Sequence, residues 1–217
     1  MPSPSRTSAG ASWSRAAPGR SGPGTEDRER DRAFDLLSRE ISSCTLCALS
    51  RGRQHAVVYR GSLEPRLVFV GEAPGAEEDR QGLPFVGRSG RLLDQAVGAL
   101  GDRLGPYGAL NLLKCRPPAN RFDPRAAATC RPYLDRQLAL LRPRAVVPLG
   151  ARALRALDPE APPILKAAGV PRHGPGGWLF PLLHPAAALR SRRLRERWDH
   201  DVGALGVWLA EPPFQTL

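Results

Sequence analysis

Apolar runs alternate along the chain with stretches in which apolar residues recur at helical spacing. Four apolar runs predict buried strands, at residues 67–70, 109–113, 145–150 and 178–183. Helical spacing predicts helices at residues 27–43, 89–100, 127–141, 151–157 and 194–209. Residues 158–177 are rich in proline and glycine, which predicts a loop. Strands that alternate with helices predict an α/β sandwich with a mostly parallel sheet.

Polar residues follow three of the predicted strands. The turn at residues 71–75 comes after the first strand, Asn111 interrupts the second, and His184 follows the fourth. Because ligands bind at the carboxyl ends of strands in open α/β sheets, we expect these residues to meet at one edge. The alternatives are a solvated acidic turn, a core amide that bonds to backbone, and a histidine that caps a strand. Phe85 favours a ligand-binding site over a solvated turn, because a surface turn gains no stability from an aromatic ring.

Composition indicates one globular domain with a basic arm. Residues 1–25 carry serine, proline, glycine, alanine and arginine, which predicts a disordered arm, and residues 26–217 form the domain. The chain is 41% hydrophobic, yet no apolar run approaches the roughly 20 residues of a membrane span. The N-terminus lacks the apolar segment of a secretory signal. We therefore expect a cytoplasmic protein that does not bind membranes, and nothing in the sequence requires more than a monomer.

The charge is strongly positive. The chain has 32 basic and 21 acidic residues, a net charge of +11, and its only lysines are Lys114 and Lys166. A basic chain has polyanions as its default partners. The charge alone does not separate DNA, RNA and acidic proteins.

The four cysteines are candidates for a metal site. Cys44 and Cys47 form a C-x2-C pair, and Cys115 and Cys130 follow far downstream. Disulfides are rare in the cytoplasm, so four thiolates around one metal centre are the favoured interpretation. The alternative is two unrelated buried thiols beside a chance pair. Spacing alone leaves zinc and an iron–sulfur cluster both open.

Four short motifs occur in order between about residues 40 and 200. They are Gly71-Glu72-Ala73-Pro74-Gly75 with Glu78-Asp79, then Pro84-Phe85-Val86-Gly87, then Asn111-x-x-Lys114-Cys115-Arg116-Pro117-Pro118-x-Asn120-Arg121, and His184-Pro185. Together with the four cysteines, this set resembles the family 4 uracil-DNA glycosylases. The resemblance implies a three-layer α/β/α sandwich with a four-stranded, mostly parallel sheet. It also implies a [4Fe–4S] cluster on the four cysteines, with a structural role.

The resemblance implies an activity too: hydrolysis of the N-glycosidic bond of a flipped-out deoxyuridine in DNA, by a monofunctional enzyme that leaves an abasic site. Phe85 would stack on the uracil. Asn111 would pair with uracil O4 and N3–H, a pattern that cytosine does not match. His184 would donate to O2, where negative charge develops as the bond breaks.

The resemblance does not by itself identify the carboxylate of the site. Another branch of uracil glycosylases has an aspartate at the position of Ala73, which lines the pocket here without offering a base. We therefore predict that Glu78 stabilises the sugar cation or positions water, and that Glu72 shapes the pocket. Leu189 would insert into the duplex, and Arg190 would hold a phosphate.

Two other functions fit parts of the sequence. One is a non-catalytic iron–sulfur module that binds nucleic acid on the same fold. The other is an α/β enzyme that binds a nucleotide phosphate at the turn of residues 71–75. The second is disfavoured because Glu72, Glu77, Glu78 and Asp79 would repel a phosphate.

Overall fold

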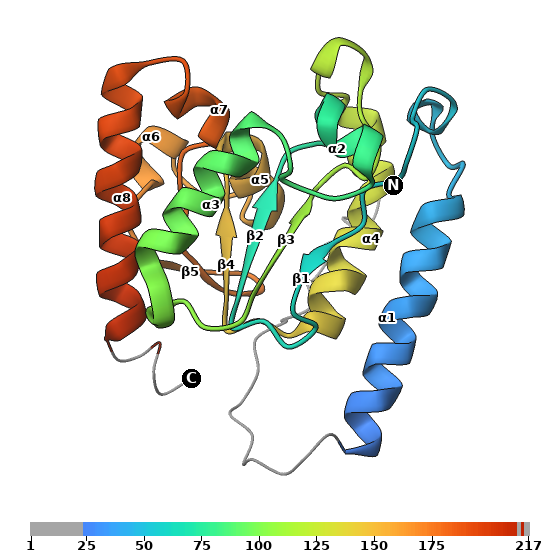
Figure 1. Cartoon of the computed structure of the whole chain (residues 1–217), viewed down its shortest axis with the longest axis horizontal. Helices are drawn as coiled ribbons and strands as arrows, with labels where there is room; N and C mark the ends of the chain where they lie inside the picture. Colours follow the sequence, from blue (N-terminus) through green and yellow to red (C-terminus); the bar gives the residue numbers. More distant parts are fainter. Residues whose placement is uncertain (1–23, 212–213, 215–217) are drawn as a thin grey trace, which may run out of the picture.

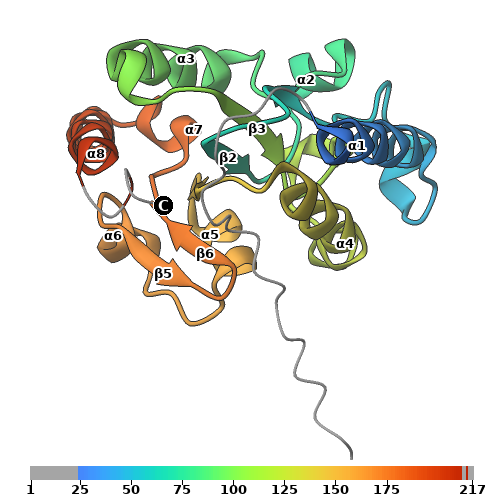
Figure 2. The same ribbon diagram turned by 90° about the horizontal axis from the view of Figure 1, so that it is seen from below.

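The computed structural model describes residues 24–211 and Phe214. The predicted basic arm, residues 1–25, lies outside the described residues except for its last two positions. Thr25 already begins the first helix. The rest forms a sheet with helices on both faces (Figures 1 and 2).

The central sheet has six strands in the order β1-β3-β2-β4-β6-β5. The inner four strands are parallel, and the two edge strands run antiparallel to their neighbours. The strands are β1 (Arg60–Gly61), β2 (Leu67–Gly71), β3 (Tyr107–Asn111), β4 (Ala145–Pro148), β5 (Arg172–Gly174) and β6 (Gly177–Leu179). The predicted α/β fold and its four parallel strands are confirmed, whereas the count of four omitted both edge strands.

The omitted elements are short. β1 has two residues and β5 has three, which is too few for a periodic pattern to show. The segment predicted as a loop, residues 158–177, contains β5 and the short helix α6 (Ile164–Ala167). β4 and β6 end earlier than predicted, with a single bridge between Leu149 and Leu182 beyond them.

The helices lie on two faces of the sheet and at its carboxyl edge (Figure 1). The remaining helices are α1 (Thr25–Ser43), α2 (Ala76–Gln81), α3 (Arg88–Leu100), α4 (Pro124–Leu141), α5 (Ala151–Leu157), α7 (Pro185–Ala188) and α8 (Arg192–Ala210). Short 3-10 turns occur at Ala48–Arg51, Gly101–Arg103 and Pro118–Asn120. The predicted long helices are all present, and α2 replaces part of a predicted loop.

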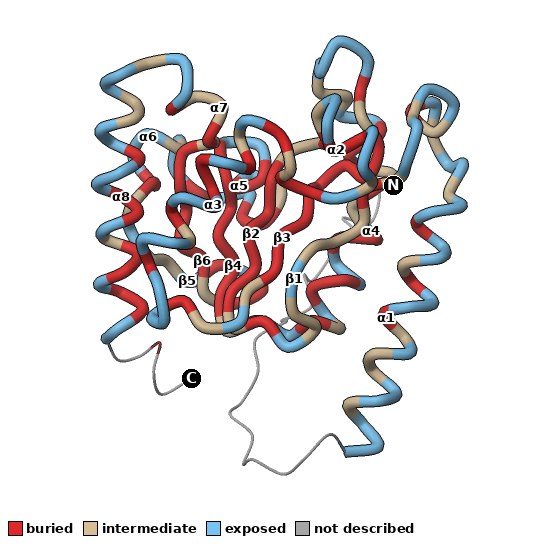
Figure 3. The backbone as a smooth tube through the Cα atoms, viewed as in Figure 1, coloured by how far each residue is buried: buried red, intermediate tan, exposed pale blue. Residues whose placement is uncertain are grey.

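Successive side chains of the central strands point to opposite faces of the sheet, so the hydrophobic core has two parts. Leu67 and Phe69 of β2 face α3 and α8, where Trp198 is fully buried. Val68 and Val70 face the other way, toward α4 and α5. This period of two is that of a strand buried on both faces. The result is a three-layer α/β/α sandwich, and Figure 3 shows the buried strands at its centre.

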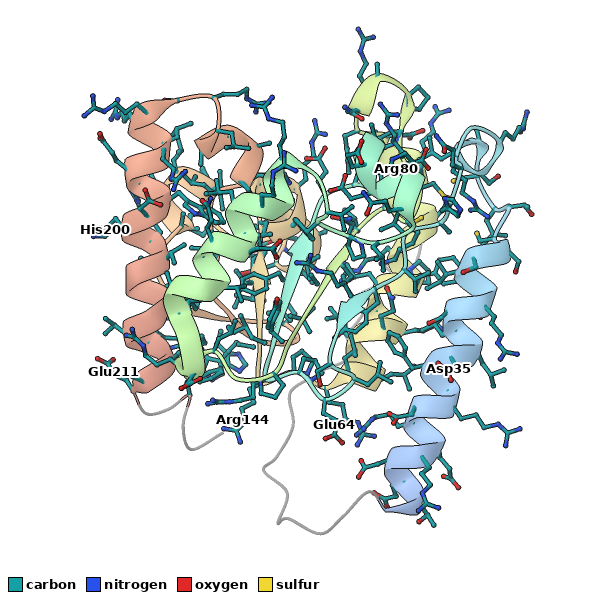
Figure 4. The ribbon with its side chains drawn as sticks, in the orientation of Figure 1. Asp35, Glu64, Arg80, Arg144, His200 and Glu211 are labelled. Atoms are coloured by element: carbon teal, nitrogen blue, oxygen red, sulfur yellow. The ribbon has the colours of Figure 1, made fainter. Side chains whose placement is uncertain are left out.

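The described residues contain no helix long and apolar enough to cross a membrane. Charged side chains project from the outer helices and from both ends of the sheet (Figure 4). Arg80 lies near the carboxyl edge of the sheet, and Glu64 and Arg144 lie at the opposite edge.

Candidate active site at the carboxyl edge of the sheet

A cavity of about 540 Å³ lies at the carboxyl edge of the parallel strands. Its wall comes from five segments: the turn after β2 with the start of α2, the loop before α3 with the start of α3, the end of β3, the 3-10 turn that follows β3, and the segment around α7. Of the predicted site residues, it is lined by Glu72, Ala73, Glu78, Phe85, Asn111, His184 and Arg190. The expectation that the turn at residues 71–75, Asn111 and His184 meet at one sheet edge is confirmed.

Phe85 and Asn111 meet above Gly71. A Cβ atom on Gly71 would lie 2.5 Å from Phe85 Cζ and 2.3 Å from Asn111 Oδ1. Glycine is therefore required at the end of β2, because any side chain would displace the ring or the amide. Because Gly71 has no side chain, the Phe85 ring and the Asn111 amide can both lie close to its Cα atom.

Asn111 is buried, at 3% exposure, yet its amide is not used by the protein. No described residue makes a hydrogen bond to its side chain, although its backbone carbonyl accepts from Lys114 Nζ at 2.6 Å. Buried amides are nearly always paired. Asn111 lines the cavity, and its amide has no partner among the described residues, which differs from a core amide bonded to backbone.

His184 is held in one tautomer. The backbone N–H of Ala186 donates to Nδ1 at 3.1 Å, which leaves the proton of the neutral ring on Nε2. Burial, reinforced by the nearby Arg190, lowers the pKa of His184 to about 4. The residue is therefore a neutral donor at physiological pH, and it also caps α7.

Glu78 fastens two loops together. One carboxylate oxygen accepts the N–H of Gly75 at 3.1 Å, and the other accepts the N–H of Gly87 at 2.8 Å. The side chain is buried, at 8% exposure. With both oxygens engaged by backbone, Glu78 holds the turn after β2 against the loop before α3. It still places a negative charge in the cavity wall.

Glu72 pairs with an arginine from a distant helix. Its carboxylate accepts from Arg152 Nη1 at 2.7 Å, and the Arg152 guanidinium lies 4.3 Å from the centre of the Phe122 ring. The pair holds the start of the turn against α5. That Glu72 shapes the pocket stays a prediction, and its partner Arg152 is one that the sequence did not indicate.

The two residues predicted to contact DNA differ in position: one lines the cavity and the other does not. Arg190 lines the cavity, while Leu189 does not and is 38% exposed. Arg88 and Ser89, at the start of α3, also line the cavity but were not predicted. Their position directly after Gly87 is the signal that could have identified them.

The four cysteines come from three segments and gather beside α4. All four are free thiols, and Cys115 and Cys130 are buried. Burial raises the pKa of Cys115, and the proximity of Cys47 and Cys44 raises it further. No group of three or more His, Cys, Asp or Glu side chains between residues 24 and 211 is arranged to hold one metal ion. The thiols are neighbours without forming a single-ion site.

Positive groups surround these thiols. Arg53 donates to Cys115 Sγ at 3.1 Å, and the buried Lys114 lies near Cys130. Burial lowers the pKa of Lys114 to about 7. Such donors stabilise thiolates and reduce the charge of any centre that they bind. Arg53 was not predicted, because its contact joins residues 62 positions apart.

Comparison with known proteins identifies the family. The sequence model of the uracil DNA glycosylase superfamily matches residues 58–202. The chain belongs to the uracil-DNA glycosylase superfamily. It is 40% identical over 166 residues to the Type-4 uracil-DNA glycosylase of Thermotoga maritima, covering 75% of this chain and 86% of the relative. It is 38% identical over 183 residues to that of Archaeoglobus fulgidus, covering 80% and 92%.

The superfamily's other branch matches less of the chain. The Type-5 uracil-DNA glycosylase of Pyrobaculum aerophilum is 35% identical over 112 residues, which cover 45% of this chain and 50% of the relative. The Type-4 enzyme of the same organism is 38% identical over 180 residues. Similarity to the Type-4 members therefore extends over more of the chain, as the motifs predicted.

Proposed function

We propose that this member of the superfamily is a Type-4, monofunctional uracil-DNA glycosylase. It would hydrolyse the N-glycosidic bond of a flipped-out deoxyuridine, release uracil and leave an abasic site in DNA. The observation that carries the proposal is the cavity in which the Phe85 ring, the unpartnered Asn111 amide and the His184 imidazole converge.

Recognition of the base would combine stacking and pairing. Phe85 presents its ring beside Asn111, so a planar base that stacks on the ring brings its edge to the amide. The amide offers one donor and one acceptor, which match uracil O4 and N3–H. Cytosine has a donor in place of O4 and an unprotonated N3, so both contacts would be lost.

Bond cleavage would be assisted by His184. As the glycosidic bond breaks, negative charge builds up on the uracil, part of it on O2. The neutral Nε2–H group is already oriented by the bond at Nδ1. A donor that is fixed before the reaction stabilises developing charge without reorganisation.

The sugar would become positively charged as the bond breaks. The negative charge of the Glu78 carboxylate would then stabilise it electrostatically. Because both Glu78 oxygens accept backbone N–H groups, we assign Glu78 to stabilising the sugar cation and not to taking a proton from water. Glu72, paired with Arg152, would support the cavity wall. Ala73 would leave space next to the sugar.

The surface around the cavity would bind the DNA backbone. Arg190 and Arg88 are both exposed at the rim and would contact phosphates. Leu189 projects beside them and would fill the gap left by the flipped nucleotide. The net charge of +11 supports a polyanionic partner.

The cysteines would hold a [4Fe–4S] cluster. Four free thiols from three segments, with Arg53 and Lys114 beside them, are the donor set of such a cluster. When bound, the cluster would join the end of α1 to α4 and to the segment after β3. Cys44, Cys47, Cys115 and Cys130 would be its ligands.

Incubation with a uracil-containing oligonucleotide, followed by alkaline cleavage of abasic sites, tests the activity. We expect strand breaks at uracil and none at cytosine or thymine. The matched variants are His184→Leu and Phe85→Ala, both of which should lose most activity. A wild-type protein that binds the oligonucleotide but releases no uracil would instead be a non-catalytic binding module.

A further inference from the structure

Phe85 has an unusual backbone conformation. Its φ angle is +57°, in the left-handed region that bulky residues rarely occupy. Its side chain is nevertheless buried, at 4% exposure. Residues held in this region persist only when the surrounding structure determines them, and they cluster at functional sites. Some contact must therefore hold Phe85 in place.

Two glycines restrict Phe85 from either end. A Cβ atom on Gly90, in the first turn of α3, would lie 1.8 Å from the Phe85 carbonyl oxygen. A Cβ atom on Gly71 would lie 2.5 Å from Cζ. Both glycines allow close approach. Neither makes a directional bond, so contact alone does not select the left-handed conformation.

The directional contact comes from the edge strand. Arg60 of β1 donates from Nη1 to the Phe85 carbonyl oxygen at 3.2 Å. From Nη2 it donates to Asp94 of α3 at 2.6 Å. Rotating Phe85 back to an ordinary φ would carry its carbonyl away from Arg60. The hydrogen bond therefore favours the conformation observed.

The arginine itself is well anchored. Arg60 pairs with Ala109 of β3, two residues before Asn111. The hydroxyl of the preceding Tyr59 donates to the Ser62 carbonyl at 2.5 Å, and its ring covers Gly108. The Arg60 side chain is 25% exposed. β1 is thus a short strand that carries the guanidinium to a fixed place behind the cavity.

We infer that Arg60, held by Asp94, is a positioning residue that keeps Phe85 in its left-handed conformation and so orients the ring for the base. Arg60 does not line the cavity. Its effect would pass entirely through the Phe85 ring. The inference rests on the proposed stacking of uracil on Phe85, and it gives β1 a role in base recognition.

A double-mutant cycle between Arg60 and Phe85 tests this. The variants are Arg60→Met, Phe85→Leu and the double variant, and the measurement is single-turnover release of uracil. We expect Arg60→Met to slow release about tenfold, equivalent to about 1.4 kcal/mol. In the Phe85→Leu background the same change should have no further effect, because no ring remains to be oriented.

Two binding measurements separate positioning from loss of charge. Inhibition by free uracil should weaken about as much as excision in Arg60→Met, whereas affinity for abasic product DNA should match that of Arg91→Met. Arg91 is an exposed arginine on the same helix as Asp94, and its substitution removes an equal charge. Weaker binding of abasic DNA in Arg60→Met alone would assign Arg60 to a phosphate and overturn the inference.

The remaining outcomes are also decisive. If Arg60→Met does not fold, Asp94→Asn replaces it in the cycle, since it loosens Arg60 without removing it. Additive effects in either cycle, or a wild-type rate in Arg60→Met, would overturn the positioning role while leaving the glycosylase activity intact. A wild-type protein that releases no uracil would refute the proposed function itself.

Discussion

The polar groups of the cavity owe their states to backbone atoms nearby. The His184 ring accepts one peptide N–H at Nδ1, and the Glu78 carboxylate accepts two. Each contact fixes an orientation while leaving a face of the side chain toward the cavity. Prepared in this way, the groups need little rearrangement when the base enters.

The tautomer of His184 leads to a pH prediction. Its pKa is lowered from 6.5 to about 4 by burial and by Arg190. Uracil release should therefore show no inflection at His184's ordinary pKa. The rate should fall only as the pH approaches about 4, when a proton on Nδ1 would oppose the Ala186 N–H. Single-turnover rates between pH 4 and 8 provide the measurement.

Folding stability gives the same transition an independent readout. The unfolded chain binds a proton at His184 near pH 6.5, whereas the folded protein binds one only near pH 4. The unfolded state is thus favoured as the pH falls through this interval. A His184→Gln variant should lack this contribution. An inflection of the wild-type excision rate near 6.5 that disappears in His184→Gln would contradict the assignment.

Base choice belongs to Asn111. In Asn111→Asp, an acceptor replaces the donor that faces O4, which opposes uracil, while the same acceptor can receive the amino group of cytosine. A mispaired buried contact costs about 1–3 kcal/mol, so uracil release should fall roughly ten- to a hundredfold. Cytosine release should stay slow but rise above background. Release of both bases is measured in single turnovers, and a wild-type rate on uracil would exclude Asn111 from recognition.

Among the elements, α2 joins the turn after β2 to the loop before α3. It has only six residues, yet Glu78 on its first turn bonds to Gly75 and Gly87 on either side. An isolated helix of this length is unstable. Its conformation depends on these tertiary contacts, and the position of Phe85 depends in turn on where Gly87 is held.

Glu78→Gln should therefore reduce stability and activity together. An amide can accept only one of the two N–H bonds and directs its own donor at the other. The loss of one buried bond costs about 1–3 kcal/mol, which lowers the melting temperature by roughly 2–10 °C in a domain of this size. Thermal unfolding of Glu78→Gln and of Glu77→Gln measures this.

Glu77→Gln is the matched control, because Glu77 is exposed on the same helix and its hydrogen bonds within the described part of the chain go to Arg80 and Gln81. Its melting temperature should stay near that of the wild type. Equal stability of both variants, combined with lost excision in Glu78→Gln alone, would instead favour direct action of Glu78 on water.

The sequence patterns predicted the long helices and strands and missed the short ones. The apolar runs around Val68 and Val146 are buried on both faces, so their composition alone indicated central strands. β1 and β5 are held by pairing with the strands beside them and carry no pattern of their own. α2 was expected as part of a loop because it presents charged residues and too few turns for a period to appear.

The same limit applies to the site. Asn111 and His184 follow strands, and topology alone brings such positions to one edge. Their partners were not predictable, since Arg152 reaches Glu72 across 80 positions and Arg60 reaches Phe85 across 25. Such contacts depend on the packing of helices and edge strands, and a single sequence contains no sign of them.

At the scale of the whole molecule, the four cysteines lie where the outer helix α1, the helix α4 and the segment after β3 meet. α1 packs mainly on α4 at the outer side of the sandwich (Figure 2), and Cys44 lies at its C-terminal end. Cys130 lies within α4 and Cys115 follows β3. Asp79 of α2 also accepts the N–H of Gln54, beyond the C-x2-C pair, at 3.0 Å. A cluster on these cysteines would fasten α1 and its following loop to the side of the active site.

This arrangement predicts that the cluster matters for folding before it matters for chemistry. Protein prepared without oxygen should be brown and contain about four irons per chain. Cys44→Ser should lose iron and unfold at least about 5 °C lower, since about 2 kcal/mol corresponds to such a shift. Ser43→Ala, a substitution at the exposed position before Cys44, should change neither the iron content nor the unfolding temperature.

At a temperature where Cys44→Ser remains folded, uracil release should persist, because none of the cysteines lines the cavity. One zinc and no iron per chain would refute the cluster, and a stable, fully loaded but inactive Cys44→Ser would indicate a direct role in catalysis.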